Sequence, residues 1–260
     1  MTTTPKILSL AVLLSLTVGA TGQDTSNPQT FLPSGVSLGC GLGLFSVRDE
    51  YISSEKYSGI LPYINLEWMR FRAKSAYHLE FEYQHSTDIT NNTISAEVRQ
   101  FVFNQDYSYP VGSIPVFSNN MYAYLGPSVQ FFFCDINYDF ARPGTFISPN
   151  TFGIIGSLGV NCALIYPANE KLRMEGFLRS NLLSFGGKKI NEYKYSDEPA
   201  PTLLTVFTTG KIDGDISIRY YLSRKVSSSL GYRFDLSRIA KWEPYIATSS
   251  SLVISVNYTF

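Results

Sequence analysis

The last nine residues of the chain alternate strictly between two kinds of side chain. One set is apolar and ends in two aromatic residues: Leu252, Ile254, Val256, Tyr258 and Phe260. The other set is smaller and mostly polar: Val253, Ser255, Asn257 and Thr259. A period of two is typical of a β-strand, because successive side chains point to opposite faces. The pattern therefore predicts a strand that runs to the C-terminal residue.

The same alternation recurs along the chain and predicts about ten strands, with eight or twelve as alternatives. They lie near residues 36–47, 61–71, 77–84, 94–103, 121–133, 152–165, 172–182, 206–222, 229–235 and 252–260. In the strand near 94–103 we assign Ile94, Ala96, Val98 and Val102 to the apolar face, with Gln100 beside them. Pro127 would remove a hydrogen-bond donor from a strand interior, so we expect a bulge or local break there.

The segments between these strands differ in length in an ordered way. Short connections lie near 73–75, 167–171 and 223–226, and long ones near 48–59, 134–150, 185–202 and 236–249. Short turns at one end and long loops at the other are typical of an up-and-down barrel, and an even strand count returns both termini to one side. The proline-containing connector 104–120 is longer than this scheme predicts.

Charged side chains gather on the face opposite the apolar stripes. A charge facing lipid at mid-depth costs about 2–4 kcal/mol, so this segregation favours a membrane barrel. The predicted interior charge network is Glu67, Glu80, Glu82, Glu97, Arg99, Arg173, Glu175, Arg179, Lys211, Asp213, Asp215, Arg219 and Arg233. A barrel of about this size has little spare volume, so we expect an interior closed by salt bridges or at most a narrow pore.

The C-terminal strand resembles the closing strand of bacterial outer-membrane β-barrels, a class that includes small OmpA-like and porin-like proteins. In that class the assembly machinery reads a C-terminal aromatic residue preceded by alternating apolar residues, here Phe260, Tyr258, Val256 and Ile254. The resemblance implies an all-β fold, a transmembrane antiparallel up-and-down β-barrel over 35–260. It also implies a Gram-negative outer-membrane location and contact with outer-membrane lipid and lipopolysaccharide.

Composition agrees with export to a membrane. Charged residues make up 16% of the chain and aromatic residues 15%, whereas soluble domains carry about 25% charge. Lys6 followed by the apolar run 7–18 and a small-residue site at 18–20 predicts a signal peptide over 1–20, followed by a periplasmic lead-in over 21–34. The formal net charge is zero, so nothing suggests a nucleic-acid partner.

The chemistry-bearing residues give weak signals. Cys40, Cys134 and Cys162 are odd in number and widely spaced, so neither a disulfide framework nor a metal site follows, and we expect no cofactor. Gly35–Gly39 matches G-x-S-x-G, but the alternation runs straight through it where that motif requires a strand, a sharp turn and a helix.

Two enzyme alternatives remain open at the rim. His85, Ser86 and Thr87 resemble the His and Ser of outer-membrane lipid A deacylases, but the residue two positions after the His is Thr87. Outer-membrane proteases use Asp and His groups at the barrel mouth, whereas Asp213 and Asp215 have no nearby His. His78 is more simply an internal partner beside Glu80.

The leading functional expectation is non-enzymatic: envelope structure, a narrow channel for a small solute, or binding of a surface ligand through long loops. The alternative is an outer-membrane hydrolase, deacylase-like or protease-like, acting at the extracellular rim. A secreted soluble β-sandwich or lectin is a third possibility, and would partition into water without detergent.

Overall fold

The computed structural model describes residues 34–49, 56–72, 74–91, 94–139, 150–191, 202–205, 207–240 and 245–260. Within these ranges the chain forms β-strands joined by turns. The strands are β1 (Gly35–Asp49), β2 (Lys56–Arg72), β3 (Ser75–Thr90), β4 (Ser95–Val116), β5 (Asn119–Asp139), β6 (Asn150–Pro167), β7 (Leu172–Asn191), β8 (Thr202–Thr205), β9 (Thr209–Tyr221), β10 (Val226–Ile239) and β11 (Tyr245–Thr259). The predicted signal peptide over 1–20 and all of the predicted lead-in over 21–34 except Ser34 lie outside the described residues.

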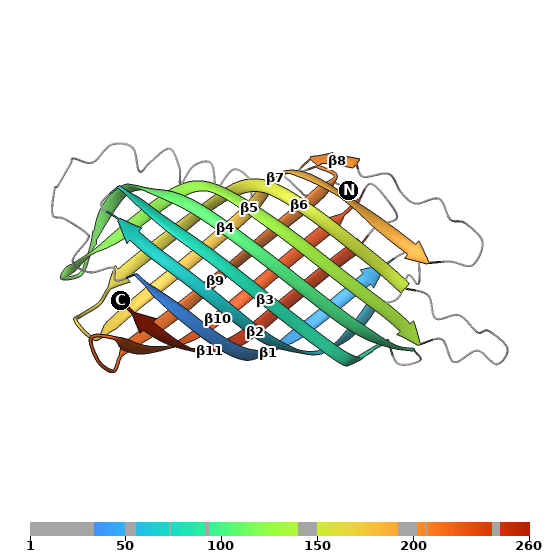
Figure 1. The fold of residues 1–260 in the computed structure, drawn as a ribbon, viewed down its shortest axis with the longest axis horizontal. Coiled ribbons are helices and arrows are strands. Elements are labelled where there is room, and N and C mark those ends of the chain that lie inside the picture. The colour runs from blue at the N-terminus through green and yellow to red at the C-terminus, as the bar shows by residue number, and fades with distance from the viewer. Residues whose placement is uncertain are drawn as a thin grey trace.

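The strands close into one antiparallel barrel whose wall has ten strand positions, hereafter called staves (Figure 1). Their order is β6-β5-β4-β3-β2-β1-β11-β10-β9-β7, and a further pairing of β6 with β7 closes the wall. β8 and β9 both pair with β7, so together they make one interrupted stave. The predicted all-β, up-and-down barrel of about ten strands is confirmed.

Both described ends of the chain lie at the same end of the barrel, which we call the terminal end. Gly35 at the start of β1 pairs with Thr259 at the end of β11, and the Phe260 amide donates to the Ser34 carbonyl at 3.1 Å. The opposite end, where β1 stops and β2 begins, is the distal end. This arrangement follows from the even number of staves.

The outward face is apolar over most of its height. Leu42, Leu252 and Ile254 are each exposed by more than 60% although they are large aliphatic residues. Trp68 and Tyr77 stack edge to face at 5.3 Å near the terminal end, with Arg70 exposed just beyond them. A water-soluble protein would bury such a surface, whereas a lipid-facing wall requires it. No helix in the described ranges is long and apolar enough to span a membrane.

Small residues allow the first stave to pack closely against its neighbours. Gly39 lies on the inward face of β1, and a Cβ added there would sit 2.1 Å from Asn65 Oδ1 and 2.5 Å from Ser255 Oγ. Glycine is therefore required at position 39 by crowding rather than by turn geometry.

The barrel interior is filled in three layers. The distal layer is an apolar cluster of Phe45, Val47, Tyr57, Leu61, Ile89, Ala96, Val98, Val102, Phe132, Cys134, Ile136, Tyr138, Ile155, Ile239, Tyr245 and Ala247. The middle layer is charged. The terminal layer is a smaller cluster of Tyr124, Ala163 and Ile165, with Phe71, Ala76, Tyr122 and Phe177 packed against it.

The predicted facing of β4 was wrong. Ala96, Val98 and Val102 are at most 4% exposed and belong to the distal cluster, while Arg99 points outward. The assignment of these aliphatic residues to the lipid face rests on their apolar character alone. The interior at that level is also apolar, so hydrophobicity alone does not identify the outer face there.

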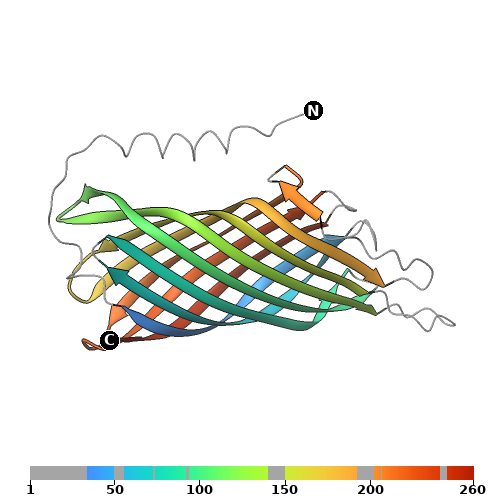
Figure 2. The same ribbon diagram turned by 45° about the horizontal axis from the view of Figure 1, so that its top comes forward.

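The connector predicted over 104–120 is instead an extension of two strands. β4 and β5 continue as a hairpin to a turn at Phe117, whose φ is 52°, and Phe117 is 97% exposed. β3 pairs with β4 only as far as Ser108, so the hairpin extends past its β3 neighbour (Figures 1 and 2).

The local break expected at Pro127 is present on the β4 side of β5, whereas the bulge lies further along the hairpin. The β4–β5 ladder passes from Asp106–Ser128 to Tyr109–Leu125, skipping the positions beside Pro127, and its register shift lies between Pro110 and Gly112. The β5–β6 ladder continues unbroken through Pro127. The strand predicted over 206–222 begins later, at Thr209, because a turn occupies 207–208, and β8 lies before that turn, outside the predicted range.

Candidate functional site: the charged belt

The middle layer of the interior is a belt of ionisable side chains, hereafter the charged belt. Its acidic members are Glu67, Glu80, Glu82, Asp106, Glu175, Asp213, Asp215 and Asp235, and its basic members are Arg173, Arg179, Lys211, Arg219 and Arg233, with His78 among them. Most are less than 10% exposed. Each lies on the inward face of its strand because alternate residues along a stave point into the barrel.

Arg233 links one wall of the barrel to the other. From β10 its Nη2 donates to Glu80 Oε2 on β3 at 3.0 Å, and its Nη1 contacts the second oxygen of the same carboxylate. Nη2 also contacts Glu82, and Nη1 donates to the Tyr63 hydroxyl at 2.7 Å. The guanidinium fork thus satisfies two carboxylates and one phenol at once.

Arg179 on β7 is a second hub. Its Nε donates to Asp106 Oδ2 at 2.8 Å, its Nη1 to Asp213 Oδ2 at 2.9 Å, and its Nη2 lies 3.2 Å from Glu80 Oε2. Glu80 is therefore shared by both arginines. Arg179 and the three carboxylates around it are therefore all paired, as buried ions require.

Amide side chains connect the two hubs. Asn104 Nδ2 donates to Glu80 Oε2 at 3.1 Å and to Glu82 Oε1 at 3.2 Å. Gln130 Nε2 donates to Asn104 Oδ1 at 2.7 Å and to Asp213 Oδ1 at 3.0 Å. The result is a continuous hydrogen-bonded network across the barrel.

Two smaller ion-pair groups flank this network. Toward the terminal end Glu175 contacts Arg173 and accepts from Arg219 Nη2 at 3.0 Å. Toward the distal end Lys211 Nζ lies 3.0 Å from Asp235 Oδ2 and 4.8 Å from the centre of the Phe132 ring. The latter contact joins the charged belt to the apolar layer above it.

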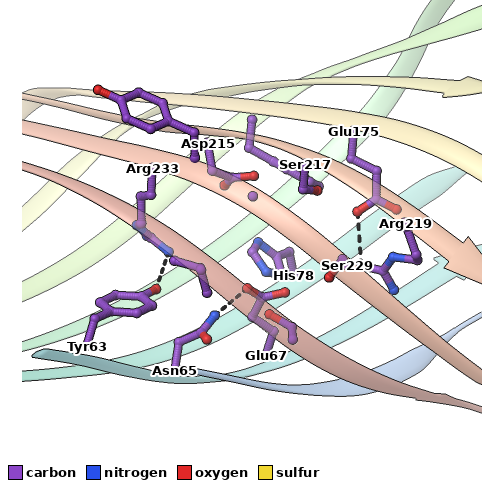
Figure 3. Close-up of a pocket in the computed structure, with 15 residues that line it drawn as sticks. Tyr63, Asn65, Glu67, His78, Glu175, Asp215, Ser217, Arg219, Ser229 and Arg233 are labelled. Carbon is purple, nitrogen blue, oxygen red and sulfur yellow. Dashed lines mark hydrogen bonds and ion pairs between the residues drawn. The ribbon is translucent and has the colours of Figure 1, made fainter. Parts of the chain in front are cut away.

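A small cavity of about 40 Å³ lies within the belt (Figure 3). Its walls include Asn65, Glu67, His78, Asp215 and Arg219. A water molecule needs about 10–15 Å³ by this measure, so the cavity has room for only a few water-sized groups. Two other interior cavities are smaller, at about 10 Å³ each.

Two residues predicted for the interior network lie elsewhere. Glu97 and Arg99 are on the outward face of β4, where the Arg99 side chain is 50% exposed. Arg99 Nε donates to Glu97 Oε1 at 2.8 Å, and His85 Nε2 lies 3.0 Å from the same oxygen. Their assignment to the lumen was wrong, because it followed from the inverted facing of β4.

The residues considered for hydrolysis do not come together. His85 points outward and is occupied by Glu97, whereas the adjacent Ser86 points inward, is 8% exposed and accepts a hydrogen bond from the Asp88 amide at 3.3 Å. Thr87 is exposed. Asp213 belongs to the charged belt, away from the barrel mouth. In the described ranges no cluster of three or more His, Cys, Asp or Glu side chains is arranged for a metal ion.

The C-terminal residues read as an insertion signal all face outward. Ile254, Val256, Tyr258 and Phe260 are exposed by 62%, 60%, 50% and 66%. Their role in recognition by an assembly machinery stays a prediction.

Several members of the site were missed by sequence reasoning. Asn104 and Asp106 lie in the predicted connector, and the predicted network does not include Tyr63, Gln130 or Asp235. The available signal was the spacing: Asn104 and Asp106 follow Val98 and Gln100 at even intervals. A strand that continued through them would therefore place all four side chains on the same inward face.

Comparison with known proteins supports the fold, but no specific family or function. No family model and no curated relative matches the chain. Among solved structures, it is similar to the outer membrane protease OmpT from Escherichia coli, with 7% identity, a TM-score of 0.51 and coverage of 88% of this chain and 97% of that one. It is also similar to the translocator domain of the autotransporter NalP from Neisseria meningitidis, with 11% identity, a TM-score of 0.47 and coverage of 98% and 97%. The fold is that of bacterial outer-membrane β-barrels.

Proposed function

We propose that this protein is a closed, non-conducting barrel of the bacterial outer membrane. Its role is structural, or it is the binding of a surface ligand at the distal end. In this proposal a signal peptide over residues 1–20 directs export, and the outward face contacts outer-membrane lipid and lipopolysaccharide. The distal end faces the cell exterior and the terminal end the periplasm.

The observation that carries the proposal is the filling of the interior. A solute moving along the axis would meet the distal apolar cluster, in which Tyr57, Ile136 and Val98 are completely buried. An ion entering such a layer loses its hydration without gaining a polar partner, which costs many kcal/mol. The layer is therefore a barrier independent of the charged belt.

The belt forms a second barrier. Passage through it would require breaking the contacts that Arg233 and Arg179 make with Glu80 from two different strands. Breaking a buried ion pair costs about 3–5 kcal/mol, because it leaves an uncompensated charge. These two obstacles in series favour a closed barrel over the narrow channel.

Single-channel recording in planar bilayers tests the proposal. The purified barrel is expected to give no conductance steps and no liposome swelling with small sugars, while an open porin reconstituted in parallel gives both. Reproducible steps from the wild-type protein, absent from protein-free bilayers, would contradict it.

A further inference from the structure

The terminal end of the barrel, where Figure 1 marks the C-terminus, carries a group of exposed cations, hereafter the basic rim. They lie in or beside the three short turns β2–β3, β6–β7 and β9–β10: Arg70, Arg72, Lys74, Lys171, Arg224 and Lys225. None of the six makes an ion pair within 4.0 Å with another described residue. Within the turns themselves, over 72–75, 167–172 and 221–226, Glu170 is the single acidic side chain. The rim therefore has a clear excess of positive charge.

Backbone hydrogen bonds join these turns into one continuous arc of the wall. The Tyr221 amide donates to the Lys171 carbonyl at 2.8 Å, which places the β6–β7 turn beside the β9–β10 turn. The Thr259 amide donates to the Lys225 carbonyl at 2.8 Å, and β1 then connects β11 to β2. The other side of this end is formed by the β4–β5 hairpin, where residues 107–134 contain no Asp, Glu, Lys or Arg. The positive charge is thus confined to one side of the barrel end.

A second, independent feature places the basic rim at a membrane surface. Val36 pairs with Trp68 on one side and with Tyr258 on the other, so these two outward aromatic residues lie in one row across β2, β1 and β11. Outward aromatic residues form girdles at the headgroup level of membrane barrels. Arg70 and Arg72 follow Trp68 at even intervals on the same outward face, and both are exposed. They therefore lie just beyond the girdle, where long cationic side chains reach the phosphate groups of lipids.

At the other end of the arc, three cations lie next to the lipid-facing wall. Tyr220 and Leu222 are outward residues of neighbouring positions on β9 and its turn, exposed by 45% and 65%. Arg224 and Lys225 follow directly in the same turn, and Lys171 lies in the adjacent turn. An acyl chain packed against Leu222 would bring its headgroup phosphate among these three cations.

We propose that the basic rim binds the headgroups of anionic phospholipids in the leaflet that surrounds the terminal end. The acyl chains lie against the apolar wall, and the Lys and Arg side chains of the turns contact the phosphates. A zwitterionic lipid such as phosphatidylcholine carries a cation of its own beside the phosphate, so the rim attracts it less strongly than phosphatidylglycerol. The site presupposes the membrane location proposed above, and the orientation proposed there makes the leaflet the periplasmic one.

Spin-labelled lipids measure this preference directly. The refolded barrel is reconstituted into phosphatidylcholine vesicles that contain a trace of spin-labelled phosphatidylglycerol or spin-labelled phosphatidylcholine. The fraction of label immobilised at the protein surface is read from the electron paramagnetic resonance spectrum. At low salt we expect phosphatidylglycerol to associate about 2–4-fold more strongly than phosphatidylcholine, because each Lys or Arg near the surface attracts an anionic lipid. The ratio should approach one in about 1 M sodium chloride, where the Debye length falls to about 3 Å.

Variants that remove or keep the charge locate the effect, after heat-modified gel mobility has shown that each one folds. Combining Lys171→Gln, Arg224→Gln and Lys225→Gln should remove about half of the preference, because half of the cations remain. Adding the Gln substitutions of the other three rim cations, at positions 70, 72 and 74, should bring the ratio close to one. The control with Lys171→Arg, Arg224→Lys and Lys225→Arg changes the same positions but keeps their charge, so it should behave as the wild type. So should Arg99→Gln, which removes an outward cation already paired with Glu97.

The possible results separate the lipid site from its rivals and from the proposed function. Equal association of the two lipids with the wild type would overturn the site, and so would a preference that survives removal of all six cations. Binding to purified peptidoglycan that is lost with the six cations, together with a lipid ratio of one, would assign the rim to a cell-wall polymer instead. The absence of any immobilised lipid would contradict the proposed membrane location, whereas immobilised lipid without a preference would contradict the lipid site alone.

Discussion

Arg233 and Glu80 face each other across the barrel with both guanidinium Nη atoms directed at one carboxylate. Their strands, β10 and β3, are separated by three others in the wall, so the contact spans the interior rather than following a ladder. This ion pair links two parts of the wall that share no backbone hydrogen bonds with each other.

Replacing Arg233 with Met should destabilise the barrel strongly. The change keeps an unbranched side chain but leaves Glu80 and Glu82 without their shared partner, so we expect a loss of about 3–5 kcal/mol in the free energy of unfolding. Urea titration of the refolded protein measures it. Arg238→Met on the same strand removes an exposed, outward arginine and should change the value by less than about 1 kcal/mol. Equal effects of the two variants would show that the contact across the interior adds little.

The facing of β4 can be tested by chemical labelling. In a background where Cys40, Cys134 and Cys162 are replaced by Ser or Ala, Arg99→Cys should react rapidly with a polar maleimide, because this position is outward and half-exposed. Val98→Cys should react slowly, because Val98 is 0% exposed within the distal apolar cluster. The reverse order of labelling would restore the facing first predicted from the sequence.

The sequence was sufficient for the outward face of strands such as β3, but insufficient for the facing of β4 and for the contents of the barrel. On β3, Tyr77, Leu79 and Phe81 alternate with His78, Glu80 and Glu82, and the structure places the first set outward and the second inward. The physical reason is that lipid requires apolar side chains at outward positions in the middle of the wall, so the pattern is strict there. The interior accepts apolar residues at one level and charged residues at another, so the pattern of inward side chains is not strict.

The partners within the charged belt could not be predicted. Arg179 meets Asp106 and Glu80, which lie on strands that are not adjacent to β7. Such contacts depend on the stagger and tilt of the staves, which decide which inward positions share one level. Alternation within a strand carries no information on that stagger. For the same reason the acids Glu67 and Asp215 were expected within the ion-paired network, although neither makes an ion pair in the described structure.

A pair of glycines gives a matched test of close packing in the wall. A Cβ at Gly126 would lie 1.9 Å from the Tyr107 carbonyl oxygen, whereas at Gly153 nothing lies within 4 Å. Gly126→Ala should therefore lower the free energy of unfolding by about 1–3 kcal/mol, because the backbone of β4 must move. Gly153→Ala should be neutral or slightly stabilising, since it reduces the entropy of the unfolded chain. Urea titration of both variants decides, and equal losses would contradict the close approach at Gly126.

A substitution at Phe260 should reduce assembly of the barrel into the membrane while leaving the stability of the folded barrel nearly unchanged. Its side chain is 66% exposed on the outward face, and only its backbone amide is fixed, by the bond to Ser34. If the terminal aromatic residue is read by the assembly machinery, Phe260→Ala should reduce several-fold the amount of heat-modifiable barrel recovered in the outer membrane after expression. The purified, refolded variant should unfold within about 1–2 kcal/mol of the wild type, since little packing within the protein is lost. Phe207→Ala, which removes another exposed phenyl ring away from the terminus, should leave recovery unchanged. Equal recovery of the Phe260 variant and the wild type would refute the insertion signal, and a large loss of stability in the refolded variant would assign any reduced recovery to folding instead.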